Sequence, residues 1–130
     1  MEVGDFAEAE MIAGPQEMAK ALCLTPADDF PEVWATSRMI GLMEIARARC
    51  MKSLIEPGQL SVGVGISIRH TAAPPVNNNV RARATFTGRD GKLYKFTIEA
   101  FDAGGKVGEG EHTRAIIATE RLLAGGCGAN

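Results

Sequence analysis

The sequence SRMIGLMEIARARCMKSL, residues 37–54, decides the fold of this 130-residue chain. At about 100° per residue, its apolar side chains gather on one broad arc of a helical wheel. The opposite side carries the charged residues Arg38, Arg49 and Lys52. Two charges depart from this separation, because Arg47 falls inside the apolar arc and Glu44 at its margin. The pattern predicts a long helix whose apolar arc is covered by other structure.

Both ends of this helix carry boundary signals. Thr36 or Ser37 is expected to cap the N-terminus, since a hydroxyl oxygen there accepts a hydrogen bond from an otherwise unpaired backbone N–H. Pro57 and Gly58 end the helical pattern. Before the helix, residues 14–29 contain two prolines and are predicted to form a loop with one short helical turn near residues 16–22.

Outside the helix the apolar residues recur with a period of two, which is typical of β-strands. The predicted strands span residues 5–12, 60–71, 80–87, 93–102 and 107–123. Tight turns are expected at Gly88-Arg89-Asp90-Gly91 and at Ala103-Gly104-Gly105-Lys106. In the last strand, residues 108–111 are interpreted as solvated and residues 115–118 as core.

The predicted order is therefore β-α-β-β-β-β. Strands joined by short turns pair antiparallel. One long apolar helix against such a sheet forms a two-layer α+β domain. A five-stranded antiparallel sheet wrapped around a central helix is the hotdog arrangement. We expect one domain over residues 1–130, with an ordered core over about residues 5–123.

The composition excludes several classes of function. The chain has 14 basic and 16 acidic residues, and this balance favours neither nucleic acid nor an anionic membrane as a partner. It contains no apolar run of about 18 residues and no signal-peptide pattern, so we expect a cytoplasmic protein. Three widely spaced cysteines, Cys23, Cys50 and Cys127, predict neither a disulfide framework nor a zinc site. Cys50 is interpreted as a packing residue. No metal or separate cofactor is expected.

Two histidines are candidates for chemistry. His70 ends a strand, directly before Thr71-Ala72-Ala73-Pro74-Pro75, and strand ends beside loops are where sites are built. His112 lies in mid-strand between charged residues and is interpreted as a structural residue on a solvated face. A lone histidine is more often structural than catalytic, and this alternative stays open for His70 as well.

Glu44 and Thr36 each allow a functional and a structural interpretation. Glu44 could form a surface ion pair with Arg47. At the margin of a buried arc it is also placed to act as a base or nucleophile. Thr36 could be a helix cap, or it could help the helix N-terminus to bind a developing oxyanion. Gly63 indicates a bulge, a close approach of the helix, or a place where a ligand nears the backbone.

Three separated segments carry a resemblance to a known family. They are FPEVWATSRMIGLMEIA (residues 30–46), SVGVGISIRHTAAPP (residues 61–75) and GEGEHTRAII (residues 108–117). In this order and with this spacing they resemble the fluoroacetyl-CoA thioesterase family of hotdog proteins. The resemblance covers about residues 30–123.

The resemblance implies a thioesterase that hydrolyses a short-chain, fluoroacetyl-like acyl-CoA. It assigns the catalytic set to Thr36, Glu44 and His70, and places Phe30 at the acyl pocket and Gly63 near the reacting water. Coenzyme A is then part of the substrate. A homodimer is expected, because an isolated hotdog sheet leaves an unpaired edge and a pocket open on one side.

Two alternatives stay open. The first is a hotdog protein that binds acyl-CoA without catalysis, since fold does not determine function. The second is a hotdog hydratase or dehydratase, which would use an Asp/His pair; the segment around His70 offers no obvious aspartate. Cations for the phosphates of coenzyme A are expected among Arg81, Arg83, Arg89 and Lys92, unless these are ordinary solvated strand residues.

Overall fold

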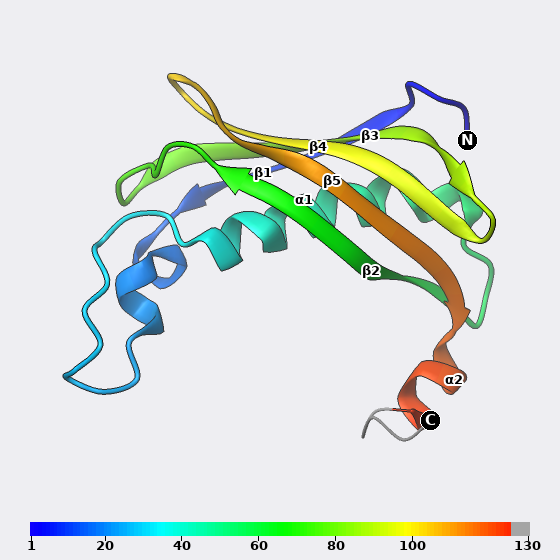
Figure 1. The fold of residues 1–130 in the computed structure, drawn as a ribbon, viewed down its shortest axis with the longest axis horizontal. Helices are drawn as coiled ribbons and strands as arrows, with labels where there is room; N and C mark the ends of the chain where they lie inside the picture. The colour runs from blue at the N-terminus through cyan, green and yellow to red at the C-terminus, as the bar shows by residue number, and fades with distance from the viewer. Residues whose placement is uncertain (126–130) are drawn as a thin grey trace.

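The structure is a computed structural model and describes residues 1–125 of the chain. One antiparallel sheet of five strands, in the order β1-β3-β4-β5-β2, curves over a single long helix (Figure 1). The strands are β1 (Phe6–Ala13), β2 (Gln59–His70), β3 (Asn78–Asp90), β4 (Leu93–Asp102) and β5 (Gly105–Ala118). This is the hotdog architecture that the sequence predicts.

The long helix α1 (Thr36–Met51) is followed by a 3-10 turn, Lys52–Leu54, so together they span the predicted range. α1 packs mainly against β1 and β3. The predicted cap is wrong: Ala35 is the N-cap, no side chain caps the helix, and Thr36 is already its first residue. The Thr36 hydroxyl bonds to a side chain of another element instead, as described below.

The core lies between α1 and the concave face of the sheet. It combines methionines of the helix with small and aromatic residues of the strands. Its fully buried members include Met18, Trp34, Met39, Met43, Met51, Val80, Ala82, Ala84, Phe96 and Ile98. Methionine has an unbranched, flexible side chain that adapts to an irregular gap between a curved sheet and a helix. Cys50 is partly buried at the edge of this core, as expected for a packing residue.

The hairpin between β3 and β4 is tighter than predicted. β3 continues through Gly88 to Asp90, and only Gly91 and Lys92 form the turn. Both glycines have positive φ angles, 148° at Gly88 and 60° at Gly91. Gly88 follows a shift in register at Phe86, so it takes up a bulge within the strand rather than forming the turn. β4 has the predicted bounds.

The last strand differs most from the prediction. β5 ends at Ala118, and a short helix, α2 (Thr119–Ala124), follows where strand was expected. Gly108 is buried rather than solvated, because a Cβ atom there would collide with Met39 of α1. Residues 115–118 are partly buried to exposed rather than core, with Ile116 packed at the edge of the core. Close packing explains two glycines of this strand: Gly108 lies against Met39 of α1, and Gly110 lies against the backbone of Ser67 and Ile68 in β2.

The loop before α1 contains two 3-10 turns, Pro15–Glu17 and Ala19–Leu22, close to the predicted position. Its two ends are joined, since Ala35 N donates to Glu17 O at 3.0 Å. Cys23 and Cys50 are free thiols, whereas Cys127 lies outside the described residues. Within residues 1–125, no helix has both the length and the apolar character needed to cross a membrane.

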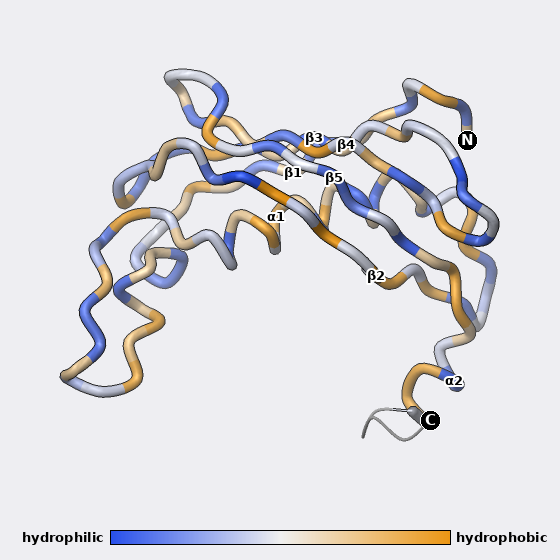
Figure 2. Tube along the Cα trace, in the orientation of Figure 1, coloured by the Kyte–Doolittle hydropathy of each residue, from blue (hydrophilic) through white to orange (hydrophobic). Residues whose placement is uncertain are grey.

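β2 is an edge strand of the sheet, and within residues 1–125 no further strand pairs with its free side. None of its residues is fully buried. Hydrophobic residues nevertheless follow it (Figure 2), and Val64 and Ile66 are 53% and 45% exposed. A long apolar edge strand is a surface on which a further strand can pair.

Candidate active site

The start of α1 and the end of β2 bring together Thr36 and His70. Thr36 Oγ1 and His70 Nδ1 lie 2.7 Å apart and share a hydrogen bond whose donor depends on the imidazole tautomer. His70 Nε2 is buried and has no hydrogen-bond partner within residues 1–125. The threonine thus orients one ring nitrogen, and the other is enclosed by the protein.

Backbone contacts hold this pair in place. Trp34 N donates to Pro74 O at 2.8 Å, which fastens the residues before α1 to the loop after β2. The Trp34 ring meets the His70 ring edge-on, with the ring centroids 6.2 Å apart. Burial lowers the pKa of His70 below its usual value of 6.5, so the imidazole is mainly neutral at neutral pH. A neutral imidazole can accept a proton, as a general base must.

Glu44 lies two turns further along α1, beside β2. Its Oε1 accepts a hydrogen bond of 2.9 Å from Nη2 of Arg47. Gly63 of β2 faces this pair, and a Cβ atom there would stand 2.9 Å from Glu44 Oε1 and 3.3 Å from Arg47 Nη2. The strand also shifts register between Gly63 and Gly65. Gly63 therefore lies at a bulge of β2, and the side chains of α1 also approach its backbone closely.

The three proposed catalytic side chains do not meet within one chain. Eight residues separate Thr36 from Glu44, which corresponds to about 12 Å along a helix that rises 1.5 Å per residue. Among the described residues Glu44 makes no side-chain hydrogen bond to Thr36 or His70. The chain thus carries two separate groups, a Thr36–His70 pair and a Glu44–Arg47 pair, which are called half-sites below because each holds part of the candidate set.

His112 is buried, so its interpretation as a solvated residue is wrong. It is 1% exposed and faces α1 in register with Phe96 of β4. Burial and the nearby guanidinium groups of Arg47 and Arg114 lower the pKa of His112 to about 3. Both its ring nitrogens are without hydrogen-bond partners within residues 1–125. The alternation of residues in β5 indicates this burial, because Glu109 and Glu111 share one face of the strand and His112 lies on the other.

Arg47 and Arg114 were not selected as site residues from the sequence, yet both are buried beside Glu44. Arg114 comes from β5, where its Nε donates to Ser61 Oγ at 3.0 Å. Burial and the charge of Arg114 lower the pKa of Arg47 to about 10, which leaves it charged at neutral pH. Buried charges are rare and mark places where a protein uses them.

Comparison with known proteins assigns the family. A family model described as fluoroacetyl-CoA-specific thioesterase matches residues 16–120. The fluoroacetyl-CoA thioesterase of Streptantibioticus cattleyicolor is 34% identical over 126 residues, which cover 95% of this chain and 91% of that protein. This chain belongs to the fluoroacetyl-CoA-specific thioesterase family. The resemblance and the assignment to the thioester hydrolases are thereby confirmed.

Solved structures agree with this assignment. The structure of the fluoroacetyl-CoA thioesterase FlK superposes with a TM-score of 0.91 at 33% identity, covering 100% of this chain and 98% of that one. A thioesterase superfamily member from Thermus thermophilus has a TM-score of 0.84 at 22% identity, covering 95% and 88% of the two chains. The second similarity concerns the fold alone.

The remaining predicted residue, Phe30, lies in the loop before α1 and is 46% exposed. Its loop is held by Lys20 N, which donates to Pro31 O at 3.1 Å. Phe30 precedes Thr36 by six residues in the sequence. Its assignment to the acyl pocket stays a prediction.

The expected cations for coenzyme A fall into two groups. Arg81 and Arg83 both bind the carboxylate of Glu8 and stack on Phe101 and Phe6 respectively. The guanidinium groups of Arg81 and Arg83 are thus already bound to other side chains of the sheet. A second group, at the β3–β4 hairpin, has fewer partners. Here Arg89 stacks on Tyr94, and Lys92 lies in the turn.

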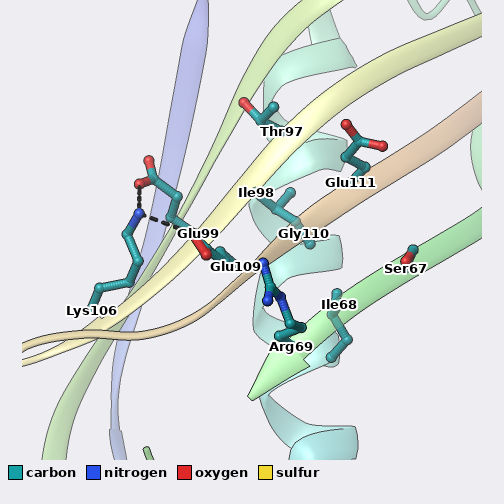
Figure 3. Close-up of a pocket in the computed structure, with 10 residues that line it drawn as sticks. All are labelled: Ser67, Ile68, Arg69, Thr97, Ile98, Glu99, Lys106, Glu109, Gly110 and Glu111. Carbon is teal, nitrogen blue, oxygen red and sulfur yellow. Dashed lines mark hydrogen bonds and ion pairs between the residues drawn. The ribbon is translucent and has the colours of Figure 1, made fainter. Parts of the chain in front are cut away.

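A hollow of about 550 Å³ is lined by residues of β2, β4 and β5, and Thr36, Glu44 and His70 are not among them (Figure 3). Thr97 and Glu99 line it, and they alternate with the buried Phe96 and Ile98, so the hollow lies on the sheet face turned away from α1. Lys106 bridges Glu99 and Glu109 there, at 2.8 and 3.2 Å. Within residues 1–125 no group of His, Cys, Asp or Glu is arranged to hold a metal ion.

Proposed function

We propose that this protein hydrolyses short-chain acyl-CoA thioesters to the free acid and coenzyme A, using Thr36, Glu44 and His70. The observation that carries the proposal is the 2.7 Å hydrogen bond between Thr36 and His70 at the start of α1. A hydroxyl and a neutral imidazole within hydrogen-bond reach, beside a helix N-terminus, form an arrangement suited to acyl transfer. Membership of a thioesterase family supports the same chemistry.

In the proposed mechanism, the thioester carbonyl oxygen faces the start of α1. The first backbone N–H groups of a helix have no partner within the helix and stabilise a developing negative charge. Glu44 either orients a water molecule that attacks the carbonyl carbon, or attacks that carbon itself to give a transient anhydride that water then hydrolyses to the free acid. His70 takes a proton from the attacking water through Nε2 and passes it to the thiolate sulfur of coenzyme A, while Thr36 fixes the ring through Nδ1. The C–S bond breaks and coenzyme A leaves as the thiol.

We further propose that the working protein is a homodimer whose second copy completes the site. Within one chain the Thr36–His70 pair and Glu44 are about 12 Å apart along α1, too far to act on one carbonyl group. A twofold axis near the middle of the helix would bring Glu44 of one copy towards the pair of the other. The exposed edge strand β2, with Val64 and Ile66, supplies an apolar surface for such pairing.

The proposed substrate has a small acyl group. In this proposal Phe30, from the loop before α1, fills part of the acyl pocket and leaves space for few carbon atoms. The relative from Streptantibioticus cattleyicolor is named for fluoroacetyl-CoA, and a fluorinated two-carbon acyl group is the first candidate here. Acetyl and propionyl groups are expected to be accepted as well, since one methylene in a pocket changes binding by only about 1–3 kcal/mol.

A thiol-release assay tests the proposal. The kcat/KM values for acetyl-, fluoroacetyl-, butyryl-, octanoyl- and phenylacetyl-CoA should be highest among the short chains, and Phe30→Ala should move the optimum towards longer ones. An optimum at octanoyl or phenylacetyl in the wild type would contradict the small pocket. Tight binding of acyl-CoA without any thiol release would favour the non-catalytic binding protein instead.

A further inference from the structure

Arg47 is the most deeply buried charge in the described part of the molecule. Its side chain is 1% exposed, whereas Glu44, its ion-pair partner, is 51% exposed. An isolated charge in a protein interior is strongly unfavourable unless it is paired. The pair is therefore not the ordinary surface ion pair that the i, i+3 spacing suggests. A buried cation here holds a carboxylate that is itself open to solvent.

The surroundings of Arg47 contain more positive charge than one carboxylate balances. Arg114 adds a second buried guanidinium, and His112, buried next to both, is neutral. Nε and Nη1 of Arg47 have no hydrogen-bond partner within residues 1–125. Of its nitrogens, Nη2 alone is engaged, and its acceptor is Glu44 Oε1. The arrangement is poor as a device for stability, but it is well suited to hold one carboxylate in a fixed position.

The geometry also restricts where the Glu44 carboxylate can go. Arg47 binds its Oε1 from within the helix, and the backbone of Gly63 lies against the same oxygen. A side chain at Gly63 would displace either group. Oε2 has no side-chain hydrogen bond among residues 1–125 and is the oxygen left to react. Arg47 thus holds Oε1 of Glu44, whereas Oε2 is left to react.

We propose that Arg47 is a positioning residue for Glu44: it binds Oε1 and thereby fixes the direction of Oε2. This role rests on the proposed thioesterase function of Glu44. Arg47 itself does not touch the substrate. Its charge strengthens the hydrogen bond to the carboxylate, and its burial acts because a packed side chain cannot swing away from its partner.

Three variants test the proposal in the full-length protein with acetyl-CoA as the probe. Arg47→Met removes the charge with little change in volume, Arg47→Lys keeps a cation, and Arg49→Met is a matched control on the exposed side of the same helix. We expect Arg47→Met to lose about 10- to 100-fold in kcat, as small misplacements of a reacting group do, with KM within about threefold because substrate binding is left intact. Arg47→Lys, which keeps a cation beside Glu44, should retain more of the wild-type kcat than Arg47→Met, and Arg49→Met should match the wild type.

A second measurement separates positioning from general support of the fold. In a Glu44→Gln background, Arg47→Met should cause no further loss, because its only route to the reaction has been removed. An equal loss in both backgrounds, or a wild-type kcat in Arg47→Met, would overturn the proposal. If Arg47→Met does not fold, Arg47→Gln gives a neutral substitution with a hydrogen-bond donor, and the loss of kcat that it causes must likewise disappear in the Glu44→Gln background. Absence of thioester hydrolysis by the wild type would refute the proposed function itself.

Discussion

The two half-sites on α1 are built in opposite ways. At the helix start, Thr36 and His70 form a neutral pair that backbone hydrogen bonds fasten to surrounding loops. In the middle of the helix, Glu44 is held by a buried guanidinium next to a second buried arginine. The first half-site depends on how two loops meet, and the second depends on charge within the core. Substitutions in the two half-sites should therefore differ in what they do to activity, assembly and stability.

The largest expected effect is on turnover. Glu44→Gln and His70→Ala should each lower kcat by about 10² or more, which is the usual contribution of a positioned base or nucleophile. The double variant should lose less than the product of the two single losses, because residues that act on one reaction step are not additive. Steady-state kinetics on the best short-chain substrate measures kcat for the two single variants and the double variant.

Replacement of the buried His112 by Gln is a useful control for this experiment, since it is a histidine of the same sheet that the proposed mechanism does not use. If His70→Ala kept wild-type turnover, the Thr36–His70 pair would be structural and the binding-protein alternative would gain support.

The next largest effect concerns assembly. Inactive Glu44→Gln and His70→Ala proteins, mixed in equal amounts and allowed to exchange subunits, should regain about a quarter of wild-type activity if each site draws on two chains. Half of the dimers are then mixed, and each mixed dimer has one intact site. Light scattering on the same samples should give the mass of a dimer. Mixtures that stay inactive despite exchange would mean that each chain holds a complete site.

The contrast between the half-sites also explains what could be predicted from sequence. The order of the elements, the bounds of β4 and the location of α1 followed from periodicity and turn residues, which are local signals. The pairing of Thr36 with His70 depends on contacts between residues 34 positions apart, and the family resemblance was needed to select them.

The errors arose where packing overrides local pattern. Gly108 was interpreted as solvated, but it is a glycine because Met39 leaves no room for a side chain. His112 and Arg114 were expected on a polar face, yet the register of β5 turns them towards α1. Thr36 has the chemistry of a cap but bonds to His70. Polar residues with a role in the core cannot be distinguished by polarity from those on the surface.

A smaller difference is expected in stability. Glu44→Gln should lower the free energy of unfolding by about 1–3 kcal/mol, because it removes the charge partner of the buried Arg47. Thr36→Ala should cost about 1 kcal/mol or less, since it removes one hydrogen bond at an exposed hydroxyl. Urea denaturation at a fixed protein concentration measures both. Equal costs for the two variants would indicate that the buried charge does not distinguish the half-sites energetically.

The smallest expected effect is the contribution of His112 to the pH dependence of the free energy of unfolding. The folded protein holds the pKa of His112 at about 3, because burial and the charges of Arg47 and Arg114 oppose protonation. The unfolded chain binds a proton at this histidine below about pH 6.5, so stability is complete above that pH and falls as the pH drops towards 3. Between pH 7.5 and 5.5 the wild type should lose about 1 kcal/mol more than His112→Gln. The pKa of His70 is lowered in the same direction, but His70 is present in both proteins and cancels from the comparison. Urea denaturation of both proteins at the two pH values measures this difference. An identical loss of unfolding free energy in both would mean that His112 takes up a proton in the folded state and that the cluster around Arg47 tolerates a further charge.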